Sequence, residues 1–145
     1  MQNEITKNIL LVEDNLADIR LITETLKSFK TPKNIYCVKD GVEAISFLKR
    51  RGANEKSIKP DIIILDLNLP NKNGFEVLKE IKEDNELKNI PTIILSISNA
   101  PDDIKKSYFL QANCYITKPI ELDEFIKAVK KIEDFWLESV KLPDQ

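Results

Sequence analysis

Five side chains that could do chemistry stand at or just after the ends of short apolar runs. Glu13 and Asp14 end or follow one run, Asp66 another and Ser96 a third, and Lys118 comes soon after a fourth. Three carboxylates held close together repel one another and are costly to bury unpaired, so they need a cation. A lysine ammonium and a serine hydroxyl suit the oxygens of a phosphoryl group. These residue types therefore predict a cation-dependent phosphoryl site.

The expected cation is Mg²⁺. The chain contains no histidine, which removes the usual zinc ligand and leaves oxygen ligands for metal chemistry. Mg²⁺ is commonly bound by one or two carboxylates together with phosphate oxygens, and we expect Mn²⁺ or Ca²⁺ to be able to replace it. The backbone carbonyl of Asn68, two residues past Asp66, is a candidate for a further ligand.

Each of these residues also has a simpler interpretation. Asp66 alone would be a solvated acid at the end of a strand or a helix cap. Glu13 and Asp14 could merely cap the first helix, with the cap at Asp14 or Asn15. Lys118 alone would be a surface lysine, and Ser96 a hydroxyl at a strand end. A helix cap needs one such residue and not two adjacent acids, so the combination favours the phosphoryl site.

The elements that position these residues can be predicted from the apolar pattern. Apolar runs of strand length alternate with segments of helical period, which predicts a parallel sheet with helices on both faces. Five strands and five helices fit a doubly wound, flavodoxin-like α/β fold with three layers and strand order 2-1-3-4-5. Ligands of such sheets bind at the carboxyl ends of the strands, where the five side chains stand. The predicted strands are 8–13, 34–38, 61–66, 91–96 and 114–116.

The last two predicted helices differ in the strength of their apolar stripes. In 101–112 the best apolar stripe is weak and consists of Ile104, Tyr108 and Ala112. The last helix, about 122–140, has a continuous stripe that includes Trp136 and Val140, with Phe135 and Leu137 off it. This surplus of apolar surface predicts a homodimer through Phe135, Trp136 and Leu137.

Size and composition limit the class of protein. The 145 residues suit one domain over 1–145, with a core at about 7–133, an extended last helix and a short tail. The net charge of -2, with lysines interleaved among acids, argues against nucleic-acid binding. No apolar run is long enough for a membrane helix and no leader peptide is evident, so we expect a cytoplasmic protein. Cys37 and Cys114 are expected to be buried thiols on opposite edges of the sheet.

These residues lie in motifs that resemble those of response-regulator receiver domains, the fold of the chemotaxis regulator, over about residues 7–133. The tail, through NCYITKP and IEDFWL (132–137), also resembles the phytochrome-associated subgroup of small regulators. Because the motifs come in the right order with the right element between each pair, the resemblance is specific. They are ILLVEDN (9–15), VKDG (38–41), DIIILDLNLPNKNG (61–74), PTIILS (91–96) and YITKP (115–119).

The resemblance implies that Asp66 is the phosphoacceptor, and that Pro70 and Gly74 form the turn after it. Four groups would bind Mg²⁺: the carboxylates of Glu13, Asp14 and Asp66 and the carbonyl of Asn68.

The resemblance also implies that Lys118 pairs with the phosphoryl group, that Ser96 is the switch hydroxyl and that Tyr115 is the switch aromatic. The Lys118–Pro119 peptide bond is expected to be cis.

As a function, the resemblance implies a stand-alone response regulator of a two-component phosphorelay. A sensor histidine kinase, of the phytochrome-like kind if the subgroup holds, would phosphorylate Asp66, and the signal would leave through contact with an unidentified protein. The chain would catalyse its own phosphorylation and slow dephosphorylation without being a turnover enzyme.

One departure keeps an alternative open. Ile97 follows the switch hydroxyl where the family usually has a small residue, and it could narrow access to Asp66. An interaction module that keeps the fold without using Asp66 is therefore the second hypothesis. A Mg²⁺-dependent phosphatase fits less well because position 68 is Asn and not an acid. A flavin carrier fits less well because EDNLAD (13–18) is acidic where a phosphate loop must be electropositive.

Overall fold

The computed structural model describes residues 5–49 and 58–143. Within these residues, five parallel strands form one sheet in the order β2-β1-β3-β4-β5, so the predicted strand order is confirmed. Most of the predicted polar connection 51–60 lies outside the described residues. The strands are β1 (Lys7–Val12), β2 (Lys33–Val38), β3 (Ile62–Leu65), β4 (Thr92–Ser96) and β5 (Cys114–Thr117).

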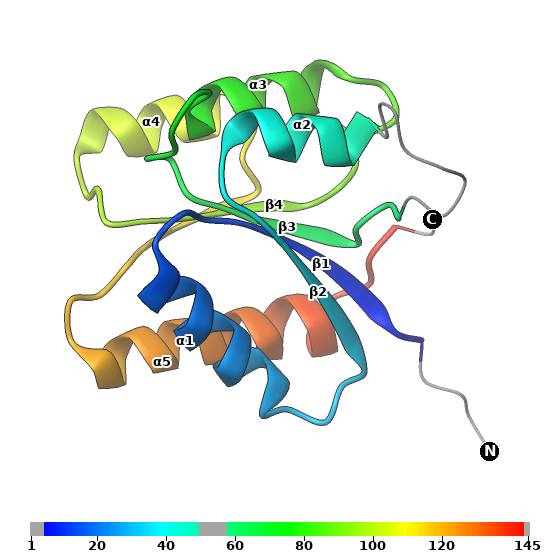
Figure 1. Cartoon of the computed structure of the whole chain (residues 1–145), viewed down its shortest axis with the longest axis vertical. Helices are drawn as coiled ribbons and strands as arrows, with labels where there is room; N and C mark the ends of the chain where they lie inside the picture. The colour runs from blue at the N-terminus through cyan, green and yellow to red at the C-terminus, as the bar shows by residue number, and fades with distance from the viewer. Residues whose placement is uncertain (1–4, 50–57, 144–145) are drawn as a thin grey trace.

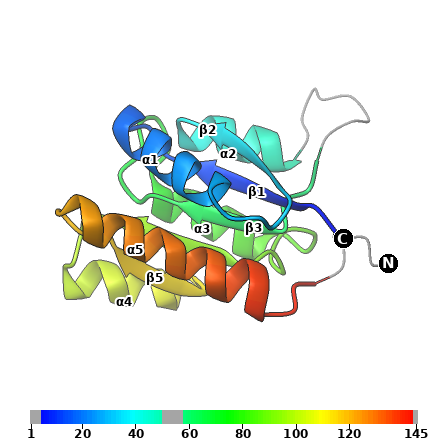
Figure 2. The ribbon, with the colours of Figure 1, turned by 90° about the horizontal axis from the view of Figure 1, so that it is seen from below.

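Helices cover both faces of the sheet, as Figure 1 shows. One face carries the first and last helices, which lie side by side in Figures 1 and 2, and the other face carries the remaining three. The helices are α1 (Leu16–Lys27), α2 (Gly41–Lys49), α3 (Gly74–Glu83), α4 (Pro101–Phe109) and α5 (Leu122–Ile132), which continues into the π-helix η1 (Glu133–Ser139).

The central strands are apolar at every position because both of their faces are covered. All four residues of β3 are buried, and successive side chains point to opposite faces. Ile63 and Leu65 join the core beneath α2 and α3, whereas Ile62 and Ile64 join the core beneath α1 and α5. The run of isoleucines and leucines thereby supplies two hydrophobic cores at once and fixes the strand between them.

Polar residues fix where the helices near the strand ends begin. The Asn15 side chain accepts a hydrogen bond from the Asp18 N–H and caps α1. The Asn73 and Glu76 side chains form a capping box at the start of α3. Because Asn15 is the cap of α1, neither Glu13 nor Asp14 is used in that role.

The predicted stripe of α4 is wrong in part. In α4, as the structure describes it, Ser107 is the residue that is fully buried, and it lies off that stripe. Tyr108, which is on the stripe, is half exposed. The Ser107 hydroxyl donates to the backbone carbonyl of Asp103, so its polar group is satisfied inside the helix and can be buried without a further partner. A pattern based on apolar residues alone cannot detect such a position.

The predicted last helix also needs a correction. After Ile132 the backbone widens into η1, in which the Val140 N–H donates to the Phe135 carbonyl five residues earlier. The wider turn rotates Leu137 onto the core, where it is 5% exposed, while Phe135 remains 55% exposed. Leu137 is therefore not part of a dimer surface, contrary to the prediction, and the helix ends at Ser139.

The same turn buries Glu133, which the sequence pattern placed off the core. Its carboxylate pairs with the Lys33 ammonium of β2 at 3.1 Å, and both side chains are almost fully enclosed. Burial raises the pKa of Glu133 above its ordinary value, although the Lys33 charge opposes this shift. The end of the last helix is thus joined to the edge strand β2 by an ion pair as well as by apolar packing.

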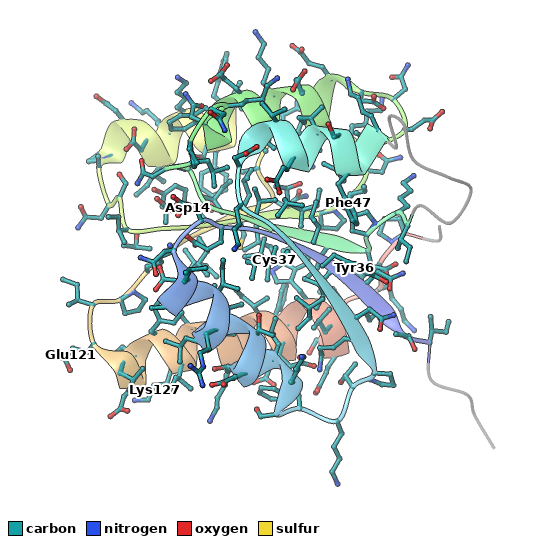
Figure 3. The ribbon with its side chains drawn as sticks, in the orientation of Figure 1. Asp14, Tyr36, Cys37, Phe47, Glu121 and Lys127 are labelled. Atoms are coloured by element: carbon teal, nitrogen blue, oxygen red, sulfur yellow. The ribbon has the colours of Figure 1, made fainter. Side chains whose placement is uncertain are left out.

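The two cysteines lie on β2 and β5, the opposite edges of the sheet, as predicted. The prediction that both are buried is wrong. Cys37, labelled in Figure 3, is exposed, and Cys114 is half-buried, although both lie on edge strands. Across the described residues, we find no helix with the length and apolar character needed to cross a membrane.

Candidate functional site

The sheet register brings the predicted site residues to one edge. Val12 pairs with Leu65, so β1 and β3 end together, and Leu65 pairs with Ile94, so β4 continues two residues further along the same edge to Ser96. The backbone continues this alignment past the strands. The Asp66 N–H donates to the Val12 carbonyl at 3.0 Å, and the Lys118 N–H donates to the Ser96 carbonyl at 2.7 Å.

Three carboxylates converge at this edge. Glu13, Asp14 and Asp66 each offer an oxygen within 4.8 Å of the others. Glu13 and Asp66 are buried, whereas Asp14, labelled in Figure 3, is exposed and keeps the cluster open to solvent. Oxygen ligands in this number, with one side open, suit a hard divalent cation such as Mg²⁺ that retains several waters.

Lys118 lies among these acids. Its ammonium donates to Glu13 Oε1 at 2.7 Å, to Asp18 Oδ2 at 2.9 Å and to Asp66 Oδ2 at 3.1 Å. The Lys118 side chain is only 3% exposed, so it is a buried cation that requires these anionic partners. The four acids around one lysine still leave a net negative charge at the edge, which favours a bound cation.

Asp18 was missed by the sequence analysis. It lies in the first turn of α1, four residues after Asp14. Asp14 precedes the helix, so no helical spacing links the two acids, and the place of Asp18 at the site depends on how far the Lys118 side chain extends.

Two pKa values reflect this arrangement. Burial, reinforced by the Asp66 charge, raises the pKa of Glu13 to about 7, although contact with Lys118 opposes the shift. For Lys118, burial disfavours the charged form, but the hydrogen bonds to Glu13 and Asp18 and the nearby Asp66 charge outweigh it and raise the pKa above its ordinary value. At neutral pH the lysine is therefore cationic, while Glu13 is poised to exchange a proton.

Backbone amides orient the two buried acids. The Asn15 N–H donates to Glu13 Oε2 at 3.1 Å, and the Asn68 N–H donates to Asp66 Oδ1 at 3.2 Å. Each acid thus has one oxygen on Lys118 and the other on a backbone amide. The role of the Asn68 carbonyl as a metal ligand stays a prediction.

The loop after Asp66 is packed tightly beneath two glycines. A Cβ atom at Gly74 would overlap the Asp66 carbonyl oxygen, and one at Gly41 would overlap the Lys72 carbonyl oxygen. The Gly74 N–H also donates to the Leu67 carbonyl at 2.9 Å. The glycines of the VKDG and DLNLPNKNG segments therefore allow the backbone of this loop to approach its neighbours closely.

The predicted switch residues lie on the adjacent strands. Ser96 ends β4 and is fully buried. Tyr115, on β5, is half-buried, and its hydroxyl donates to the Ser98 carbonyl at 2.7 Å. The Ser98 hydroxyl in turn donates to Asp103 of α4 at 2.6 Å. A chain of hydrogen bonds thus joins Tyr115 to the loop between β4 and α4.

The predicted cis peptide at Lys118–Pro119 is wrong for this structure, because no cis bond occurs among the described residues. The trans form of a bond before proline is favoured by roughly 0.5–1 kcal/mol unless tertiary contacts select the other isomer.

Ile97 is 68% exposed. It lines a recess together with Ile120 and Leu122, and Lys118 and Asp18 lie in the wall of the same recess. An apolar rim therefore borders one approach to the lysine. Whether Ile97 slows access to Asp66 stays a prediction.

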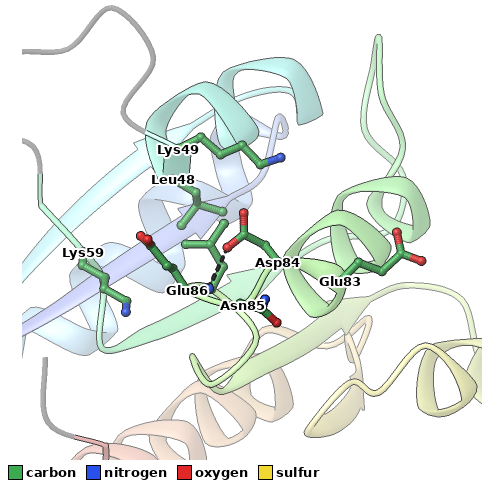
Figure 4. Close-up of a pocket in the computed structure, with 8 residues that line it drawn as sticks. Leu48, Lys49, Lys59, Glu83, Asp84, Asn85 and Glu86 are labelled. Carbon is green, nitrogen blue, oxygen red and sulfur yellow. Dashed lines mark hydrogen bonds between the residues drawn. The ribbon is translucent and has the colours of Figure 1, made fainter.

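A second recess lies at the opposite end of the sheet, where Lys59 precedes β3 and Asp84 follows α3 (Figure 4). Its Asp84 carboxylate accepts a hydrogen bond from the Glu86 N–H at 2.8 Å and so serves the local turn. This recess is separate from the acidic cluster and contains none of the predicted site residues.

Comparison with known proteins agrees with this geometry. The family model described as the response regulator receiver domain matches residues 9–130. Response regulator Rcp1 of Synechocystis sp. is 48% identical over 137 residues, which cover 94% of this chain and 93% of Rcp1.

Two crystal structures are similar throughout. The Mn²⁺-bound form of response regulator Rcp1 gives a TM-score of 0.92 at 48% identity and covers 95% of this chain and 99% of that one. The phosphorylated cyanobacterial phytochrome response regulator RcpA gives a TM-score of 0.91 at 50% identity, with coverage of 97% and 100%. Together with the family match, these similarities show that the chain belongs to the response regulator receiver domain family.

Proposed function

We propose that Asp66 is the phosphoacceptor of this two-component response regulator and that the reaction depends on Mg²⁺. The observation that carries the proposal is the contact of one buried lysine with Asp66 and Glu13 inside a three-carboxylate cluster. Such a site has acceptor, cation ligands and a charge for the phosphoryl oxygens within one small volume. Glu13, Asp14, Asp66 and the Asn68 carbonyl would hold the ion, which would neutralise charge on the phosphoryl oxygens.

The reaction needs little covalent chemistry from the protein beyond positioning. An Asp66 carboxylate oxygen forms a bond to phosphorus as the N–P bond of a phosphohistidine breaks, and the leaving imidazole keeps the electron pair and takes a proton from solvent. Lys118 supplies positive charge to a phosphoryl oxygen, and Ser96 supplies a hydroxyl. The product is an acyl phosphate that the chain then loses slowly by hydrolysis.

The donor in this proposal is a sensor histidine kinase. The similarity to RcpA, a structure described as that of a phytochrome response regulator, supports a phytochrome-like kinase. The signal would leave through contact with a further protein. The hydrogen bonds from Tyr115 to Ser98 and from Ser98 to Asp103 supply a route, since movement of Ser96 toward a phosphoryl group would disturb the loop that they hold.

Self-association through the last helix remains part of the proposal, with its surface reduced to Phe135 and Trp136. These rings meet edge to face, with centroids 5.3 Å apart, and Phe135 is 55% exposed. Light scattering at high micromolar concentration, with and without a phosphate mimic, should give a mass above one chain for the wild type and a lower mass for Phe135→Ser. A monomer mass for the wild type under both conditions would contradict this part.

The central test is Mg²⁺-dependent binding of beryllofluoride, followed by ¹H–¹⁵N NMR in the wild type and in Asp66→Asn. We expect saturable shifts around β3, β4 and the loop between β4 and α4 in the wild type only. Acetyl phosphate with Mg²⁺ should add the mass of one phosphoryl group to the wild type and none to Asp66→Asn. A folded, Mg²⁺-binding wild type that gives neither result would favour the alternative, a receiver-fold interaction module that does not use Asp66.

A further inference from the structure

Asp18 is the one acid bonded to Lys118 that does not belong to the three-carboxylate cluster. Glu13 and Asp66 contact the lysine and also lie within the cluster, whereas Asp18 contacts only the lysine. It projects from α1, and its side chain is 23% exposed, compared with 2% for Glu13 and 7% for Asp66. A cation bound by the cluster would therefore engage Glu13 and Asp66 but leave Asp18 facing the ammonium.

The hydrogen-bonding capacity of Lys118 is fully used. An ammonium has three N–H donors, and Lys118 directs them to Glu13, Asp18 and Asp66. A phosphoryl oxygen can be contacted only if one of these bonds is given up or shared. The contact to Asp66 is the longest, at 3.1 Å, and it leads to the carboxylate of the proposed acceptor, so this donor is the one nearest to where a phosphoryl group would be bound.

We propose that Asp18 is a positioning residue that acts through Lys118. The Asp18 carboxylate holds the Lys118 ammonium against α1. Its negative charge competes with the phosphoryl group for contact with that ammonium. Asp18 would thereby weaken phosphoryl binding and set how strongly phosphorylation is favoured over the unmodified state. The inference rests on the proposed function of Asp66 and assigns a regulatory part in it to the first helix.

Two effects of removing the Asp18 charge oppose each other, and the electrostatic one should be larger. Lys118 would lose one of three anchors but would keep Glu13 and gain the phosphoryl oxygen, so its position should change little. The anion bound at Asp66 would lose a neighbouring like charge and face a cation with one fewer carboxylate partner. Because Asp18 is partly exposed, solvent reduces the gain, and we expect beryllofluoride to bind about threefold to tenfold more tightly.

The test is a beryllofluoride titration at fixed Mg²⁺, followed by ¹H–¹⁵N NMR in the wild type and three variants. Asp18→Asn removes the charge with almost no change in shape, and Asp18→Glu restores a carboxylate on a longer arm. Glu24→Gln is the matched control, because Glu24 is an exposed acid of the same helix that pairs with Arg20 and does not contact Lys118. A separate titration with Mg²⁺ alone provides a readout that does not depend on the phosphoryl mimic.

The inference requires tighter beryllofluoride binding in Asp18→Asn, with return toward the wild-type affinity in Asp18→Glu and no change in Glu24→Gln. The affinity for Mg²⁺ alone should not rise, because the Asp18 charge adds to the negative charge that favours a bound cation; a gain confined to beryllofluoride therefore separates the competition for Lys118 from a general tightening of the site. Unchanged or weaker beryllofluoride binding in Asp18→Asn, or the same gain in Glu24→Gln, would overturn the inference while leaving the function of Asp66 intact. A wild type that does not bind beryllofluoride would overturn both.

Discussion

We expect a proton and a metal ion to compete for Glu13. This carboxylate is buried beside the Asp66 charge, which is why its pKa rises to about 7 in the metal-free chain. A metal ligand must give up its proton before it binds a cation, so the affinity for Mg²⁺ should fall as the pH falls through 7. If one proton is displaced, the loss approaches about tenfold per pH unit well below the pKa.

Isothermal titration with Mg²⁺ between about pH 8 and about pH 5.5 would measure this dependence. The matched variant Glu13→Gln should bind Mg²⁺ more weakly at high pH and show a flatter profile, because its side chain does not titrate. A wild-type affinity that stays constant across this range would show that Glu13 is already ionised throughout.

The raised pKa of Glu13 also affects the stability of the fold in the absence of metal. The folded pKa of Glu13, about 7, lies above its ordinary value of 4.5, so between these values the folded state holds a proton that the unfolded state has lost. The contribution of Glu13 to the free energy of unfolding is therefore fully present below about pH 4.5 and is lost as the pH rises through 7. The burial of Glu13 thus carries a stability cost at neutral pH, and we expect a bound cation to relieve it.

At the scale of residues, the sequence predicted all three carboxylates of the cluster but missed Asp18, which contacts Lys118. Glu13, Asp14 and Asp66 could be predicted because each follows an apolar run, and parallel strands bring their ends together. Asp18 has no such position, since it lies one turn inside α1, and its importance depends on where the Lys118 side chain extends. The reach of a long side chain cannot be deduced from spacing.

At the scale of elements, Gly74 connects the loop after Asp66 to the start of α3. Alanine at this position would place a Cβ against the carbonyl oxygen of Asp66, so the loop must move away from the site. We expect Gly74→Ala to lower the free energy of unfolding by roughly 2–4 kcal/mol and to weaken Mg²⁺ binding.

Urea unfolding and Mg²⁺ titration of Gly74→Ala would measure these two effects. Asn73→Ala is the matched control, because it removes the cap of α3 next to Gly74 at a cost of about 1 kcal/mol without introducing an overlap. Normal Mg²⁺ affinity in Gly74→Ala would show that the loop can yield without moving Asp66.

The π-helix at the end of the chain decides which apolar residues are core. Leu137 is 5% exposed and Phe135 is 55% exposed, although the sequence pattern put both outside the stripe. We expect Leu137→Ala to cost about 2–4 kcal/mol and Phe135→Ala less than about 1 kcal/mol in urea unfolding. Equal costs for the two variants would contradict the π-helical geometry, because that geometry is what buries Leu137 and leaves Phe135 exposed.

The change from α5 to η1 could not be predicted from the sequence. A stripe of period 3.6 fits Phe125, Val129, Ile132 and Trp136, and no residue in the sequence marks the point at which the turn widens. In the structure that point coincides with Glu133, whose carboxylate meets Lys33 of a distant strand. A tertiary ion pair accompanies the local change, and such a pair is invisible to periodicity.

At the scale of the whole molecule, the strand order could be predicted because few topologies satisfy strict alternation with right-handed crossovers. The burial of residues on the edge strands could not be predicted, because it depends on how far the helices extend over those strands. Cys37 and Cys114 illustrate this difference: their opposite edges were predicted correctly, but Cys37 is exposed and Cys114 is half-buried.

This arrangement predicts unequal thiol reactivity and no internal disulfide. The strands that carry the two cysteines are four spacings apart, roughly 19 Å at about 4.8 Å each, and a disulfide needs Cα atoms within about 7 Å. Iodoacetamide should therefore alkylate Cys37 faster than Cys114, as peptide mass spectrometry can follow, and Cys37→Ser should remove the fast phase. Equal rates would mean that Cys114 is as accessible as Cys37. A disulfide within the monomer after mild oxidation would mean that β2 and β5 are not the two edges of the sheet. Since that strand order also brings Glu13, Asp66 and Lys118 together, the same result would contradict the site.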